Sequence, residues 1–163
     1  MFRSIADFLS TWKYESESTV KIFEHLTDES LSAKVDPEGR TLGRLANHLI
    51  ETLTEMPHKL GLPLTEEFPA HTTVADLVAD YRKKSDELVA AINATLTDAS
   101  LPEMRDMYGE QWSVSMGLHA LVLHQAHHRG QMTAMMRHHG LTVTGVYGPA
   151  REEWALMGMQ PLP

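Results

Sequence analysis

Four stretches of the chain carry apolar residues at helical spacing, and this repeat restricts the fold more than any other feature. The stretches run from about Ser4 to Leu26, from Thr41 to Pro57, from Thr73 to Leu96 and from Ser113 to His139. Apolar residues that recur every three to four positions predict amphipathic helices, which bury one face against other helices. No segment shows a convincing strand pattern. The sequence therefore predicts an all-α protein built as a four-helix bundle.

Local signals define where these helices begin and end. Thr41 and Thr73 are suitable N-cap residues for the second and third helices. Pro57 is the expected end of the second helix, because proline disrupts a helix interior. Gly140 suits the position just after the fourth helix, where a left-handed residue commonly ends the chain of hydrogen bonds.

The connections exclude the simplest up-and-down bundle. Residues 57–72 and 97–112 form long connections, which are often functional in compact domains. Residues 141–149 are expected to be a loop, and a short fifth helix is expected from Arg151 to Met157. The length of 163 residues suits one domain, residues 1–163.

Composition excludes several classes of function. The chain has 22 acidic and 14 basic residues, and its formal net charge is −8. Such a charge disfavours nucleic acid and anionic membranes as partners. No apolar run approaches the ~20 residues of a membrane span, and the first residues do not resemble a signal peptide. Cysteine is absent, which excludes disulfides and thiolate metal ligands and is consistent with a cytoplasmic location.

The most informative polar residues are two histidines in the fourth helix. His124 and His128 are four positions apart on the apolar face, so their imidazoles lie one turn apart and point inward. Two such side chains can share one metal ion, as they do in zincin proteases. They could equally be hydrogen-bonded core residues, because the chain contains ten histidines and the spacing alone is weak evidence. Peptide hydrolysis of the zincin type is disfavoured, because Gln125 stands where those enzymes have a glutamate base.

A third ligand would have to come from another helix. His48 lies beside Leu45 and Leu49 on the apolar stripe of the second helix, which makes it the best candidate. The remaining histidines are less suited, because they fall in connections, at helix ends or away from the face of the pair. They are His25, His58, His71, His119, His127, His138 and His139.

These residues resemble a known family, the DinB/YfiT-like proteins. Its mark is a histidine in the second helix and a His-x-x-x-His-Arg-Gly-Gln run in the fourth, which here are His48 and residues 124–131. The resemblance covers nearly the whole chain. It implies a bundle of four main helices, of DinB/YfiT type, that often pairs as a homodimer. It also implies that His48, His124 and His128 bind one divalent transition metal, typically zinc or nickel, with open positions for water.

The resemblance further implies a function for the metal. Some members transfer a low-molecular-weight thiol, and a metal with open positions lowers the pKa of a bound thiol or water. We therefore expect a divalent-metal-binding protein, acting as a metal-dependent thiol S-transferase on a small-molecule substrate. The alternative is a non-catalytic protein that binds a metal or a small ligand. A di-iron bundle is disfavoured, because the only Glu-x-x-His run, from Glu55 to His58, is interrupted by Pro57.

Neighbouring residues suggest how the ligands are held. Glu51 and Gln131 lie about one turn after His48 and His128 and could accept a hydrogen bond from a ligand imidazole. Glu51 could instead be a solvated charge on the helix surface. Arg129 could bind a substrate carboxylate or phosphate, or form a salt bridge that ties two helices.

Two further hypotheses concern the helix faces. Trp12 could form the opposite wall of the pocket with Glu15, Ser16 and Thr19, which interrupt the first apolar stripe; alternatively, the helix faces solvent there. A glycine inside a helix, such as Gly130, costs roughly 1 kcal/mol of helix stability relative to alanine. A close helix crossing would explain its presence.

Overall fold

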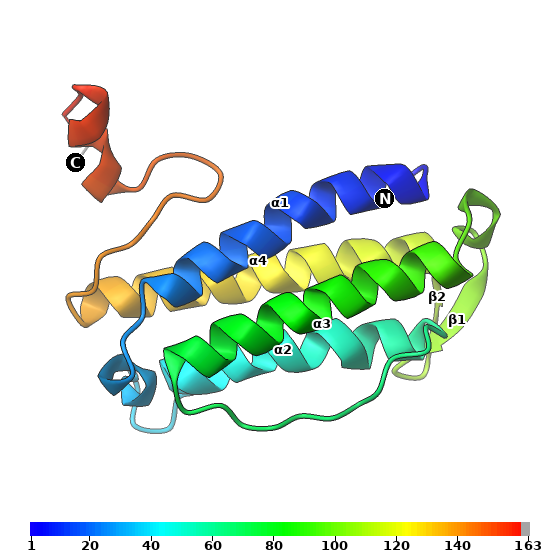
Figure 1. Cartoon of the computed structure of the whole chain (residues 1–163), viewed down its shortest axis with the longest axis horizontal. Coiled ribbons are helices and arrows are strands. Elements are labelled where there is room, and N and C mark those ends of the chain that lie inside the picture. Colours follow the sequence, from blue (N-terminus) through cyan, green and yellow to red (C-terminus); the bar gives the residue numbers. More distant parts are fainter. Residues whose placement is uncertain (161–163) are drawn as a thin grey trace.

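The structure is a computed structural model that describes residues 1–160, and its main elements are four long helices (Figure 1). They are α1 (Ile5–Glu24), α2 (Leu42–Lys59), α3 (Val74–Thr95) and α4 (Val114–His138). Three short 3₁₀-helices are η1 (Glu29–Ser32), η2 (Asp98–Ser100) and η3 (Arg151–Met157), and a hairpin is formed by β1 (Met104–Met107) and β2 (Glu110–Ser113). The predicted helical bundle and the short fifth helix are confirmed.

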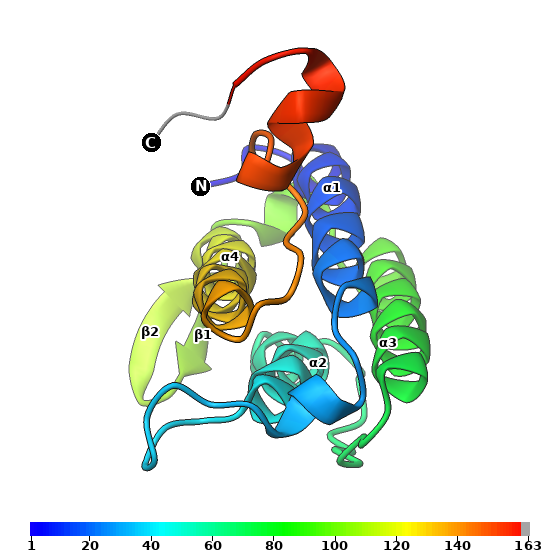
Figure 2. The ribbon, with the colours of Figure 1, turned by 90° about the vertical axis from the view of Figure 1, so that its left-hand side faces the viewer.

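Each long helix packs against two others. The order around the bundle is α1, α3, α2, α4, and the end-on view shows this arrangement (Figure 2). In Figure 1, α2 and α3 run in the same direction, because the connection between them returns along the length of the bundle. This return path explains why that connection is long. Within residues 1–160, no helix is both long enough and apolar enough to cross a bilayer.

The helix N-termini follow the predicted capping chemistry. The side chains of Ser4, Thr41, Thr73 and Ser113 each accept a hydrogen bond from the backbone N–H three residues later. The predicted end of α2 at Pro57 is wrong by two residues, because the helix continues to Lys59. Proline removes a single donor there, and the side chains of Met56 and Pro57 are buried against the core.

One short hairpin was not predicted, because no segment has a convincing strand pattern. Met104 pairs with Ser113 and Met107 with Glu110 in an antiparallel hairpin that packs on α2 and α4. Tyr108 and Gly109 form its two-residue turn, and both have positive φ angles, of 60° and 87°. The strands have only four residues each, and the turn lacks the Asn-Gly or Asp-Gly signal of common hairpins. Packing against the helices therefore stabilises a hairpin that the local sequence does not predict.

The centre of the bundle contains a fully buried amide. Gln125 Nε2 donates to the Leu49 carbonyl, at 3.0 Å, and to Thr52 Oγ1 in α2. Its Oε1 accepts from the hydroxyls of Tyr81 in α3, at 3.0 Å, and of Thr19 in α1. Gln125 thus links α4 to each of the other three long helices. Since a buried polar group left unpaired is costly, these bonds fix the rotation of α4 about its axis.

One turn further along α4, Arg129 forms a buried ion pair with Glu15 of α1. Their side chains are 2% and 6% exposed. Arg129 also donates to the Glu15 carbonyl, at 3.0 Å, and to Thr19 Oγ1, at 2.9 Å, and its other nitrogen contacts the Tyr147 hydroxyl. The interpretation of Arg129 as a salt bridge between helices is therefore the correct one. The alternative that α1 faces solvent at Glu15 and Thr19 is wrong. Both side chains are buried, and Arg129 donates a hydrogen bond to each of them.

The glycines that allow close packing are not the one expected from the sequence. A Cβ on Gly130 would meet nothing within 4 Å, so no helix crosses closely there and that hypothesis is wrong. A Cβ on Gly43, in the first turn of α2, would lie 2.9 Å from the Leu31 carbonyl oxygen of η1. One close approach is therefore between η1 and the start of α2, and another is between Gly117 of α4 and Leu60, whose side chain would clash with a Cβ there.

This difference predicts opposite effects for the same substitution. Gly43→Ala is expected to lower the free energy of unfolding by about 1–3 kcal/mol, because its methyl group meets fixed backbone. Gly130→Ala, the matched control in an open helical position, is expected to raise it by about 0.5–1 kcal/mol. Urea denaturation followed by circular dichroism measures both values. Equal shifts for the two variants would contradict the assignment of the close contact to Gly43.

The ion pair gives a second prediction. Arg129→Met leaves the Glu15 carboxylate buried without its partner and is expected to cost about 3–5 kcal/mol of stability. The double variant Arg129→Met/Glu15→Met removes both charges and is expected to recover much of that loss. Thermal unfolding of the two variants beside the wild type measures the difference. A single variant as stable as the wild type would show that the pair is not important for stability.

Candidate metal centre

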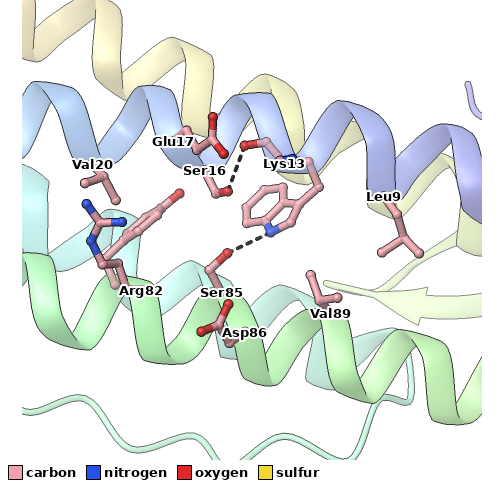
Figure 3. A pocket seen from close by; sticks show the side chains of 11 residues that line it. Leu9, Lys13, Ser16, Glu17, Val20, Arg82, Ser85, Asp86 and Val89 are labelled. Carbon is pink, nitrogen blue, oxygen red and sulfur yellow. Dashed lines mark hydrogen bonds between the residues drawn. The ribbon is translucent and has the colours of Figure 1, made fainter.

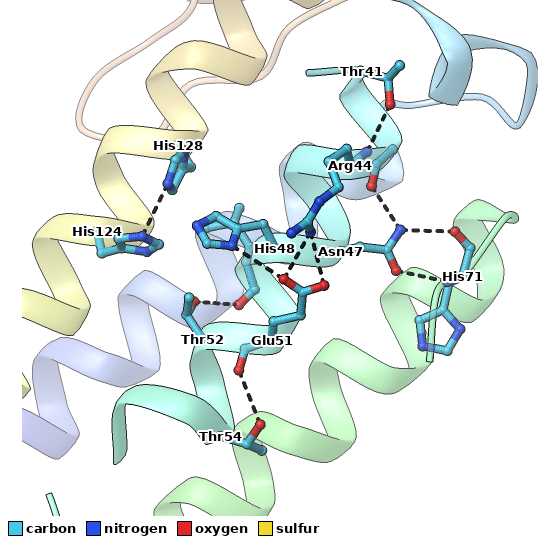
Figure 4. A network of polar contacts seen from close by, with 12 residues as sticks. Thr41, Arg44, Asn47, His48, Glu51, Thr52, Thr54, His71, His124 and His128 are labelled. Carbon is cyan, nitrogen blue, oxygen red and sulfur yellow. Dashed lines mark hydrogen bonds and ion pairs between the residues drawn. The ribbon is translucent and has the colours of Figure 1, made fainter. Parts of the chain in front are cut away.

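Three histidines from two neighbouring helices meet at one point. His48 comes from α2, and His124 and His128 come from successive turns of α4; Figure 4 shows the three imidazoles pointing toward one another. One ring nitrogen from each lies within 4.8 Å of the others. The Nε2 atoms of His124 and His128 are 3.2 Å apart. The structure thus brings together the three residues that the sequence singled out, and we call them the His cluster.

The outer nitrogens of two of these rings are held by hydrogen bonds. His128 Nδ1 contacts Gln131 Oε1 at 2.6 Å, and His48 Nδ1 contacts Glu51 Oε2 at 3.4 Å. Both oxygens only accept, so each Nδ1 carries the proton and each Nε2 is left with a free lone pair. This is the arrangement in which metal-bound histidines are usually oriented. The predicted supporting roles of Glu51 and Gln131 fit these contacts.

The charge state of the cluster is set by its surroundings. Burial, followed by the neighbouring His128 and His48, lowers the pKa of the His124 imidazole to about 4. Burial also lowers the pKa of His48 and of His128, although Glu51 and Gln131 oppose the shift. All three rings are therefore neutral at pH 7, which is the form that binds metals.

The donor set fits a divalent transition metal. Nitrogen ligands at about 2.0–2.1 Å from a tetrahedral zinc lie roughly 3.4 Å from one another, close to the 3.2 Å between His124 Nε2 and His128 Nε2. A cation between these atoms also removes the repulsion of facing lone pairs. Three imidazoles leave at least one coordination position open, as in catalytic sites. This group could therefore hold a metal ion, and imidazole ligands suit zinc, nickel, copper or iron.

Cavities open on two sides of the His cluster. His48 and His124 line one of about 550 Å³, whose walls come from α2, the segment before α3, the hairpin and α4. His128 and Gln131 line another of about 420 Å³, together with Arg40. A small molecule could therefore reach the cluster without any rearrangement of the bundle.

Arg44 joins the polar network beside the first cavity. Its guanidinium contacts both carboxylate oxygens of Glu51, at 3.0 and 2.9 Å, and Glu51 in turn contacts His48 (Figure 4). Glu51 is thus not a free solvated charge. Arg44 was not predicted from the sequence, although its spacing of seven residues from Glu51, two helical turns, is the signal that could have identified it.

Two predicted site residues lie elsewhere. Trp12 is buried and lines a different cavity, between α1 and α3 (Figure 3), where its Nε1 donates to Ser85 Oγ at 3.0 Å. Ser16 lines that cavity too. Arg129 faces α1 rather than the His cluster. Adjacent residues of a helix point about 100° apart, so Arg129 is directed away from His128.

The aromatic part of the first cavity was not predicted from the sequence either. Phe68, from the segment before α3, and Tyr108 and Trp112, from the hairpin, line it. They come from segments interpreted only as long connections, and nothing in their local sequence places them beside the histidines. The available signal was the length of those connections.

Comparison with known proteins agrees with the fold and with the family resemblance. The DinB family model matches residues 1–162. A Bacillus subtilis protein, described as uncharacterized protein YrdA, is 37% identical over 163 residues, which cover 98% of each chain. A crystal structure of a DinB-like protein from Bacillus cereus superposes with a TM-score of 0.85 at 41% identity, covering 90% of this chain and 100% of that one.

A more distant relative shares the fold alone. The DinB-like protein YjoA from Bacillus subtilis superposes with a TM-score of 0.69 at 16% identity, covering 88% of this chain and 98% of that one. The match to the family model extends over almost the whole sequence, and two relatives exceed one third identity. The resemblance inferred from the histidine motif is therefore confirmed, and the chain belongs to the DinB family.

Proposed function

We propose that the protein binds one divalent transition metal, zinc or nickel, through His48, His124 and His128 and acts as a metal-dependent enzyme. The observation that carries this proposal is the convergence of three neutral imidazoles within 4.8 Å beside an open cavity. When bound, such an ion supplies Lewis acidity that lowers the pKa of a coordinating thiol or water toward neutrality.

The residues around the cluster would then have separate tasks. Glu51 and Gln131 hold the His48 and His128 rings with Nε2 toward the centre. Arg44 holds Glu51 in place and offsets its charge. Gln125 and Arg129 contribute indirectly, because their bonds to the other helices set the direction in which His124 and His128 point.

The reaction we propose is transfer of an external low-molecular-weight thiol to an electrophilic carbon. The new bond joins sulfur to that carbon, the leaving group departs with its electron pair, and the thiol proton passes to solvent. The chain contains no cysteine, so no thiol of the protein competes with the external thiol for the metal. A non-catalytic role in binding a metal or small ligand uses the same residues and is the alternative.

Metal content is the first prediction from the proposed function. Protein purified without chelator or metal-affinity resin is expected to contain about one zinc or nickel ion per chain by elemental analysis. His128→Ala is expected to lose it, because two imidazoles alone hold such an ion weakly. His127→Ala is the matched control, since its ring is exposed on the same helix, and it is expected to retain the metal.

A supporting variant sharpens this test. Gln131→Ala is expected to keep the ligands but to weaken metal affinity by about 10- to 100-fold, because the His128 ring is no longer oriented. Competition with a chromogenic chelator measures the change. Absence of metal from every protein, even after addition of zinc or nickel, would overturn the proposed site and leave the His cluster as a hydrogen-bonded group of the core.

Thiol transfer is the second prediction. Metal-loaded protein is expected to accelerate conjugation of one member of a panel of low-molecular-weight thiols with chlorodinitrobenzene, in which sulfur displaces chloride. We expect the rate to exceed that of His128→Ala, which lacks the metal, by at least about tenfold, since bound metals typically stabilise developing charge by several kcal/mol. Absorbance of the thioether product follows the reaction. Full metal loading without conjugation of any thiol would leave the binding role in place of the transferase.

A further inference from the structure

The cavity beside His48 and His124 has two chemically different ends. One end is polar and is formed by the two histidines with Arg44 and Glu51. The other end is mainly apolar, although Thr52 also lines the cavity, as does Glu55, which accepts a hydrogen bond from the Tyr108 hydroxyl. This end is formed by Met56, Phe68, Tyr108, Trp112 and Ala120. The volume of the whole cavity, about 550 Å³, is in the range typical of small-ligand sites.

The aromatic side chains at the apolar end are only partly covered. Phe68 is 43% exposed and Tyr108 is 56% exposed, and Trp112 is half-buried. The rings of Tyr108 and Trp112 meet edge to face, with centroids 6.3 Å apart. Aromatic rings left exposed around one hollow bury large areas when a flat apolar molecule enters it.

Tyr108 occupies its position at a conformational cost. Its φ of 60° lies in the left-handed region, where a bulky residue is strained and where asparagine or glycine is usual in a two-residue hairpin turn. The ring is nevertheless held firmly. Its hydroxyl donates to Glu55 at 2.8 Å, and the Lys59 ammonium lies 5.2 Å from the ring centroid. Such strain is commonly retained where a side chain serves a binding site.

The charges around the cavity are already compensated. Arg44 is paired with Glu51 at one end, and Lys59 with Glu55 near the other. A charged group in the body of a ligand would therefore meet no unpaired partner. The cavity favours an uncharged aromatic body, and only the end at the His cluster offers strong polar interactions.

We propose that this cavity takes a compact aromatic substrate whose ring lies against Phe68, Tyr108 and Trp112 while its metal-coordinating group reaches the His cluster. This inference rests on the proposed function, because the bound metal supplies the anchor for the polar group. It adds the substrate class and assigns the choice of that class to the hairpin and the segment before α3.

The test compares two hydroxamic acids on the zinc-loaded protein by calorimetry. Acetohydroxamic acid carries only the coordinating group, and benzohydroxamic acid adds a phenyl ring. We expect benzohydroxamic acid to bind at least about tenfold more tightly, because its ring leaves water for the aromatic end of the cavity.

Three variants locate the origin of that preference. Phe68→Ala and Tyr108→Asn remove rings, and asparagine suits the turn, so the hairpin is retained. Each is expected to reduce the advantage of benzohydroxamic acid by about threefold or more while leaving the affinity for acetohydroxamic acid unchanged. Tyr14→Ala is the matched control, because that tyrosine is exposed on α1 and does not line the cavity. It is expected to bind both acids as the wild type does.

The outcomes separate this inference from the proposed metal site. Equal affinity for the two acids would overturn the aromatic assignment and leave the metal site standing. A preference that persists in both ring-removing variants would overturn the role of these residues. Failure of both acids to bind the zinc-loaded protein would overturn the open coordination position, and the inference with it.

Discussion

The hydrogen bonds of the buried Gln125 amide are the constraint on which the rest of the structure depends. They reach α1, α2 and α3 from a single point on α4, so α4 has only one rotation that satisfies them. Arg129 repeats the restriction one turn later through Glu15. His124 and His128 each precede one of these residues, and helix geometry therefore turns both imidazoles toward α2. The polar core and the His cluster therefore lie on two faces of the same two turns of α4.

The same helix thus separates structural from chemical tasks. On one face, the buried side chains of Gln125 and Arg129 are hydrogen-bonded to other helices, which makes the bundle specific. On the other, the rings of His48, His124 and His128 converge on a common point, and Glu51 and Gln131 orient His48 and His128 with Nε2 toward it. Ring nitrogens that face one another are unfavourable unless a cation or proton lies between their lone pairs. This local frustration is typical of functional sites rather than of a packed core.

The hairpin gives the bundle a feature that helices alone would not provide. The turn of the hairpin places Tyr108, and β2 places Trp112, beside the cavity that His48 and His124 line, and Glu55 fixes the tyrosine through its hydroxyl. Because the hairpin and the segment before α3 are connections rather than bundle helices, their residues can vary with little effect on the core. The fold can therefore keep one His cluster while different walls select different small molecules, which is how many shared folds support different functions.

The sequence by itself determined the four helices, their capped starts and the three histidines, because these depend on periodicity and on contacts within a few residues. It did not determine what lies opposite each face. Arg129 had two interpretations until the structure placed Glu15 beside it, Trp12 lines another cavity, and Gly43, unlike Gly130, lies at a close backbone approach. The hairpin was missed because packing on α2 and α4, and not strand propensity, stabilises it. Such features arise from residues distant in the chain, so only the tertiary structure could decide them.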